Sequence, residues 1–292
     1  MTSGSLSRRG FTLVELLISM IVTAIIGAAL VRMVLSQARF MDQQEAWREA
    51  RSVSRGGINR LLSDLRAVEA SGGLVAAAAG GQDFTVHVPY AFGILCGIAG
   101  NVWTMSLLPV DSAMAAAPGY SGFAVRRANG TYDYWASNTI VAGTTALCLN
   151  GLYDSIHTVP TLNGSPAGRV VNVTRNAGIL MPAPPRGSIT FLYRDIRYEF
   201  KASVDIPGRT ALWRTTVTGG ATEELTAPFD ATARVNFYNL DVVPAQAAVP
   251  TLSNVRGLEL LLHGMSERTP GGSAAPKTAN MTTSVFFENR PD

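Results

Sequence analysis

Glu15 is the residue whose position in this chain most clearly requires a chemical explanation. It is the only ionisable side chain in the 21 residues from Phe11 to Val31, which are otherwise uncharged and mostly apolar. As a helix, this run would be about 31 Å long, enough to cross a hydrocarbon core of about 30 Å. A carboxylate within that core costs about 3 kcal/mol on insertion, so by default it marks a functional site.

Two simpler interpretations of this segment remain open. A secretory signal peptide has an apolar core of about 7–15 residues followed by a cleavage site with small residues. This run is longer, and it continues without a turn signal into helix-forming sequence as far as Arg39. A plain membrane anchor would account for Arg8 and Arg9 through the positive-inside rule, but it gives no reason for Glu15.

The segment GFTLVE at residues 10–15, with Arg8 and Arg9 before it, resembles the class III signal of type IV pilins and type II secretion pseudopilins. The resemblance implies that a prepilin peptidase cleaves between Gly10 and Phe11. It also implies that the same enzyme methylates the new amine of Phe11. Residues 1–10 would then be a removed leader, and Arg8 and Arg9 its basic end.

The same resemblance gives Glu15 a role in assembly. In filaments of this family the apolar N-terminal helices pack together away from water, where a carboxylate and an amine both need partners. Pairing Glu15 with the Phe11 amine of a neighbouring subunit would satisfy both, and breaking such a buried pair costs about 3–5 kcal/mol. The alternative is a neutral, protonated Glu15 that faces lipid headgroups.

Charge and cysteine content narrow the possible functions. Without the leader, the chain has 22 basic and 21 acidic side chains, so we expect no nucleic-acid surface.

Cys96 and Cys148 are the two cysteines, and an even count in an oxidising compartment favours a disulfide. That bridge would close a loop of about 50 residues and contribute roughly 4 kcal/mol on the entropy model. Two separate buried thiols remain the alternative.

The rest of the pattern predicts an α+β fold, in which a long N-terminal helix packs on a β-rich globular domain. We expect the helix over residues 11–68, with 11–31 in the membrane or filament core and a weak point or kink at Gly56-Gly57. An apolar stripe that includes Phe40 and Trp47 should dock on the following domain. That domain should span residues 69–292, with a variable insert at about 90–185.

Alternating patterns predict the strands of this domain, and Asn129-Gly130 predicts a tight hairpin between two of them. The expected strands are 84–88, 123–127, 132–135, 169–174, 188–193, 196–201, 211–217, 234–240, 257–263 and 283–287. The order of motifs in the C-terminal third resembles PilW-like minor pilins, which are related to the J-type pseudopilins of type II secretion. The ending, Glu288-Asn289-Arg290, departs modestly from the pattern of that family.

No motif points to catalysis. The three histidines, His87, His157 and His263, are far apart, and the chain has neither a nucleophile elbow nor a nucleotide-binding loop. We therefore expect a non-enzymatic protein without metal or cofactor.

The resemblance implies a minor pilin that initiates or caps a type IV pilus, or alternatively a pseudopilin at the tip of a secretion pseudopilus. Its partners would be the prepilin peptidase, other minor and major pilins, the inner-membrane assembly platform and the lipid bilayer. It would cross the inner membrane once, with its globular domain in the periplasm, before entering the pilus or pseudopilus tip. A membrane-anchored binding protein that never polymerises is a third possibility.

Overall fold

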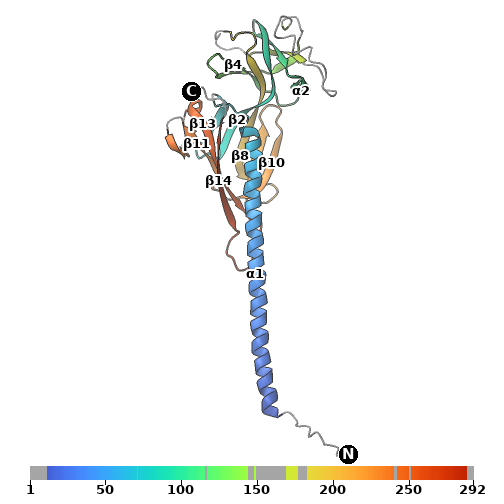
Figure 1. Ribbon diagram of the computed structural model, residues 1–292, viewed down its shortest axis with the longest axis vertical. Helices are drawn as coiled ribbons and strands as arrows, with labels where there is room; N and C mark the ends of the chain where they lie inside the picture. The colour runs from blue at the N-terminus through green and yellow to red at the C-terminus, as the bar shows by residue number, and fades with distance from the viewer. Residues whose placement is uncertain are drawn as a thin grey trace, which may run out of the picture.

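A single long helix and an antiparallel sheet make up the protein. The computed structural model describes residues 12–70, 72–115, 117–143, 148, 169–176, 183–239, 242–249 and 251–287. Helix α1 runs over Leu13–Leu65, 53 residues without interruption. Its first half projects as a bare stalk, while its second half lies along the sheet (Figure 1). This arrangement confirms the predicted α+β fold.

The stalk is exposed along its whole length. Every described residue from Thr12 to Asp42 is exposed, and Ala46 is the first buried residue of α1. By length and composition α1 is able to cross a membrane, and the described residues contain one such helix. The apolar part packs against nothing within the described chain, so it presents a large exposed apolar surface of the kind that marks an interaction site.

The second half of α1 docks through small side chains. Ala46, Ala50, Ser54 and Gly57 are buried against the sheet, followed by larger side chains towards Leu65. The predicted apolar stripe docks only in part: Phe40 is 62% exposed and Trp47 is 38% exposed, whereas Ala50 is buried and Val53 packs against the core. Small residues take the place of the two large side chains because helix and sheet backbones approach closely here, leaving no room for large side chains.

The glycine pair that suggested a kink has a packing role instead. The helix continues through Gly56-Gly57, and Figure 1 shows it nearly straight there. A Cβ on Gly57 would lie 2.9 Å from Cζ of Phe229, whereas a Cβ on Gly56 would come no closer than 3.9 Å to any atom of the sheet. Gly57 therefore permits close contact with the core, and the helix ends at Leu65 rather than at the predicted residue 68.

The strands of the described residues form one antiparallel sheet. The strands, numbered in chain order, are β1 Leu74–Ala77, β2 Asp83–Ala99, β3 Val102–Leu107, β4 Gly122–Arg126, β5 Tyr132–Ala136, β6 Thr139–Ala142, β7 Arg169–Thr174, β8 Ile189–Ala202, β9 Thr210–Thr216, β10 Thr222–Phe229, β11 Arg234–Asn239, β12 Val242–Gln246, β13 Val255–Met265 and β14 Thr278–Phe286. A short helix, α2 (Pro109–Ser112), and a 3₁₀ turn, η3 (Leu252–Asn254), lie between strands. The main path runs β12-β11-β13-β10-β9-β8-β2-β3-β7-β6, with β1, β4, β5 and β14 paired off it.

Two long strands connect the whole domain. Strands β2 and β8 pair antiparallel from Asp83 opposite Glu199 to Ile94 opposite Ile189. The predicted strands 188–193 and 196–201 are therefore one strand, because the backbone passes Arg194 and Asp195 without turning. The predicted hairpin at Asn129-Gly130 is confirmed between β4 and β5. The patterns did not indicate β1, β3, β6, β10 and β12, which are short or lack clear alternation of apolar and polar residues.

Two apolar cores lie along β2 and β8. The proximal core packs Leu61 and Leu65 of α1 against sheet residues that include Phe84 and Tyr198. The distal core is built around Trp103, Phe123 and neighbours, and α1 contributes nothing to it among the described residues. Strands β3 to β7, which fall within the predicted insert, build this distal end of the sheet beyond the tip of α1 (Figure 1).

Candidate assembly site

The first turn of α1 holds Glu15 in a capping box. The side chain of Thr12 accepts a hydrogen bond from the backbone N–H of Glu15 at 3.3 Å. In return, Oε2 of Glu15 accepts bonds from the N–H of Thr12 at 3.0 Å and from its hydroxyl at 3.1 Å. This exchange satisfies two helix-terminal donors that otherwise lack partners. Thr12 was missed in the sequence analysis, although a Thr-x-x-Glu pattern before an apolar run signals such a box.

The box determines what the Glu15 carboxylate can still do. Both bonds from Thr12 go to Oε2, and no hydrogen bond from the described residues reaches Oε1. The positive end of the helix dipole also favours an anion in this first turn. Glu15 is exposed, so Oε1 is open to a cationic partner from another molecule. Arg8, Arg9, Gly10 and Phe11 lie outside the described residues.

A buried hydroxyl in the second half of α1 makes one polar attachment of the helix to the sheet. Oγ of Ser54 in α1 accepts a hydrogen bond from the N–H of Gly264 in β13 at 2.8 Å. The hydroxyl donates to the carbonyl of Ala279 in β14 at 2.9 Å, and it lies 3.3 Å from the carbonyl of Leu262. Gly264 and Ala279 are opposite each other in the β13–β14 pair, so one side chain of the helix joins two neighbouring strands.

A polar group at the end of α1 makes a second attachment. The hydroxyl of Tyr198 in β8 donates to Oδ2 of Asp64 at 2.5 Å, and Nε of Arg214 in β9 donates to the same oxygen at 3.1 Å. Burial raises the pKa of the Tyr198 phenol, and the nearby Asp64 charge adds to this effect. The phenol therefore stays protonated and remains a donor, which holds the helix end in register with the sheet.

The predicted disulfide is present in the distal part of the domain. Cys96 of β2 and Cys148 form the bridge, with Cα atoms 4.8 Å apart, and both residues are buried. Together with Val170 they make a small apolar cluster of their own. The bridge therefore ties Cys148 to β2, one of the two long strands.

The described histidines do not come together. Nδ1 of His87 lies 2.5 Å from Oδ1 of Asp195, and its ring packs between Tyr134 and Tyr193. His263 instead contacts the hydroxyl of Thr232. In the described chain, the side chain of His87 contacts one carboxylate and two tyrosines. The pair and its two tyrosines link the β4–β5 hairpin to the central strands.

Comparison with known proteins identifies the N-terminal segment. Residues 6–31 match the family described as the prokaryotic N-terminal methylation motif. Neither a curated protein nor a solved structure gave a significant match to the chain. The motif implies processing by a prepilin peptidase and assembly with other pilins, and α1 provides the membrane anchor for the globular domain. The combination of this motif, the long apolar helix and the antiparallel domain makes the chain a type IV pilin-like protein with a class III signal.

Proposed function

We propose that this chain is a minor pilin that is cleaved between Gly10 and Phe11, methylated at Phe11 and incorporated at the tip of a type IV pilus, which it initiates or caps. The observation that carries the proposal is the bare stalk of α1 with a single carboxylate, Glu15, in its first turn. An apolar helix surface of this kind is stable in lipid or when it is packed against similar helices. The core of a filament would provide such packing.

A position at the tip is supported by the globular domain. The sheet extends beyond the end of α1 into a second core, and a disulfide ties down part of that extension. A subunit in the body of a filament has other subunits above and below it, whereas a subunit at the tip has open space beyond it for a large distal lobe. The motif order in the C-terminal third, which resembles PilW-like minor pilins, favours the same role.

A pseudopilin at the tip of a type II secretion pseudopilus is the alternative. The N-terminal methylation motif accommodates both roles. Deleting the gene separates them: loss of surface pili with normal protein secretion supports the minor pilin. Normal pili with secretion blocked would overturn that assignment and favour the pseudopilin.

Glu15 acts in this proposal by gaining a second partner while it keeps its capping bonds. Before assembly its carboxylate caps α1 through Oε2, and during assembly Oε1 would receive the methylated Phe11 amine of an adjacent subunit. The cap involves Thr12, which stays in the mature chain after cleavage at Gly10. Capping and pairing are therefore compatible, and the capping bonds hold the carboxylate in one orientation for its new partner.

The variant Glu15→Gln tests this role, because the amide oxygen can still accept the capping bonds while the negative charge is lost. We expect the variant to be processed and to accumulate in the membrane but to be absent from sheared filaments. Thr12→Val is the matched control, since it removes the hydroxyl of the cap and keeps the carboxylate. It should enter filaments at close to the normal level, because the backbone N–H of residue 12 still donates to Oε2 and holds the carboxylate. Normal incorporation of Glu15→Gln would refute the pairing role.

A further inference from the structure

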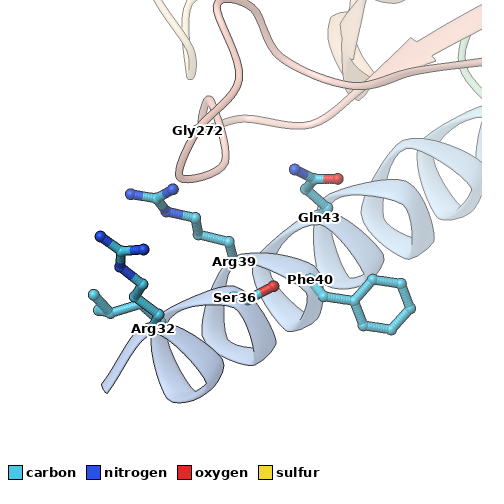
Figure 2. Close-up of a pocket in the computed structure, with 7 residues that line it drawn as sticks. Arg32, Ser36, Arg39, Phe40, Gln43 and Gly272 are labelled. Carbon is cyan, nitrogen blue, oxygen red and sulfur yellow. The ribbon is translucent and has the colours of Figure 1, made fainter. Parts of the chain in front are cut away.

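A hollow lined by Arg32 and Arg39 lies on α1 directly after the end of its apolar segment. Its volume is about 650 Å³, and it is lined by α1 residues between Arg32 and Gln43 and by Gly272 in the turn between β13 and β14. Figure 2 shows Arg32 and Arg39 on the same side of the helix, with the turn above them and Phe40 pointing away. We call this feature the arginine hollow.

The position of the hollow matches the headgroup layer of a bilayer. Val31 is the last residue of the apolar run, and Arg32 is the first basic residue after it. Each headgroup layer is about 5–8 Å thick, and Arg39 lies about 10 Å above Arg32 along the helix axis. Helical side chains lean towards the N-terminal end, so the guanidinium of Arg39 reaches down towards the membrane. Arg32 therefore lies at the level of the lipid phosphates on the side of the globular domain, and Arg39 extends the hollow by about 10 Å away from the bilayer.

The two arginines lack ion-pair partners within the described chain. Neither Arg32 nor Arg39 is within 4 Å of a described carboxylate oxygen, although Asp42 follows Arg39 by only three residues. The planar guanidinium group matches phosphate oxygens in a bidentate manner. Ser36, which lines the hollow between the two arginines, adds a hydroxyl donor. Two unpaired cations and a hydroxyl around one hollow favour an anion with several oxygens.

The turn above the hollow lies close to Arg39, with which it lines the hollow. A Cβ on Gly272, whose φ is +81°, would lie 3.5 Å from Cδ of Arg39. The turn closes through the N–H of Ser273, which donates to the carbonyl of Pro270 at 3.0 Å. A ligand held by Arg39 would therefore lie next to the turn of the β13–β14 hairpin. Ser54 of α1 is hydrogen-bonded to both strands of this hairpin.

We propose that the arginine hollow binds the headgroup phosphate of an anionic phospholipid on the side of the membrane that carries the globular domain. The bound headgroup fixes the height of the domain above the bilayer through Arg39 and the turn at Gly272. The proposal rests on membrane anchoring by α1, and it is independent of whether the filament is a pilus or a pseudopilus.

The test uses the full-length chain in nanodiscs of phosphatidylcholine, with or without an equal share of phosphatidylglycerol. Native mass spectrometry gives the preference for retained phosphatidylglycerol, and hydrogen exchange follows residues 270–273. We expect the wild type to prefer phosphatidylglycerol and to exchange more slowly at this turn when that lipid is present. The double variant Arg32→Gln/Arg39→Gln should reduce the preference roughly 30-fold, on the basis of typical values for basic residues at anionic surfaces.

The matched control is Arg48→Gln/Arg55→Gln, which removes two exposed arginines at the same seven-residue spacing but further from the membrane. It should keep the lipid preference and the protection of the turn. An equal loss of phosphatidylglycerol preference in both double variants would show that the total positive charge of the helix causes the preference, and it would overturn the proposal. It would also be overturned if inorganic phosphate alone protected the turn in phosphatidylcholine discs. Unchanged lipid binding by Arg32→Gln/Arg39→Gln, with loss from filaments, would instead assign these arginines to a neighbouring subunit.

Discussion

Replacing Ser54 by alanine is the sharpest test of how the stalk is held on the globular domain. The hydroxyl connects α1 to Gly264 and Ala279, and the side chain is fully buried. In Ser54→Ala the N–H of Gly264 loses its 2.8 Å acceptor. The carbonyl of Ala279 loses a 2.9 Å donor at the same time. Water has little access to this contact, because a Cβ on Gly264 would lie 2.3 Å from the carbonyl oxygen of Ala50.

The expected cost follows from these contacts. A buried polar group that loses its partner costs about 1–3 kcal/mol, and alanine regains a few tenths through its higher helix propensity. We expect a net loss of about 2 kcal/mol in the free energy of unfolding of the globular domain. For a domain of about 200 residues, this lowers Tm by about 4–8 °C.

The assay is thermal unfolding of the full-length protein in detergent, followed by near-UV circular dichroism, with hydrogen exchange along residues 46–61. The control is Ser52→Ala, the same substitution at an exposed position two residues earlier in α1. Ser52→Ala should leave Tm unchanged or raise it slightly, because alanine favours the helix. Equal Tm values for the two variants would show that the Ser54 hydrogen bonds do not stabilise the contact between α1 and the sheet.

Three further predictions test packing, the disulfide and pH dependence. Gly57→Ala should lower the free energy of unfolding by about 1–3 kcal/mol, because the new Cβ would press on the buried ring of Phe229. Gly56→Ala should raise it by up to about 1 kcal/mol, because alanine favours the helix and has space there. Denaturant titration measures both changes, and changes of the same sign would contradict this explanation. The double variant Cys96→Ser/Cys148→Ser opens a loop with a sequence separation of 52 and should lose about 4 kcal/mol in the same titration, and unchanged stability would show that the bridge constrains little. Burial raises the pKa of the Tyr90 phenol to about 12, although the positive charge of Arg194 acts to lower it. The contribution of the protonated phenol to the free energy of unfolding is therefore complete below about pH 10 and is lost as the pH rises through about 12. Tyr90→Phe should therefore flatten the alkaline limb of stability against pH, and an unchanged limb would contradict the assignment.

Features that depend on neighbouring residues in the chain could be predicted from the sequence. The apolar run from Phe11 to Val31, interrupted only by the charge of Glu15, predicts the stalk, and Asn129-Gly130 predicts the hairpin. Both signals lie in residues that are neighbours along the chain. The disulfide was predictable because the chain has only two cysteines. The capping box was equally local, and the Thr12-x-x-Glu15 pattern was sufficient to find it.

Features that depend on distant partners could not be predicted. Nothing near Ser54 indicates that Gly264, 210 residues further on, leaves space for the helix. Without that partner, the pattern gave Phe40 and Trp47 the same docking role as Ala50, although of these three only Ala50 is buried. The length of β8 was hidden for a similar reason, since Arg194 and Asp195 interrupt the alternation while their backbone stays in register with β2.

N-terminal mass spectrometry of the protein from sheared filaments tests the central claim most directly. The account predicts a mature chain that begins with N-methylated Phe11, recovered from the filament fraction. That result would establish cleavage after Gly10, methylation and incorporation in one measurement. A chain in that fraction that still begins with Met1, or a processed chain found only in the membrane fraction, would contradict the account.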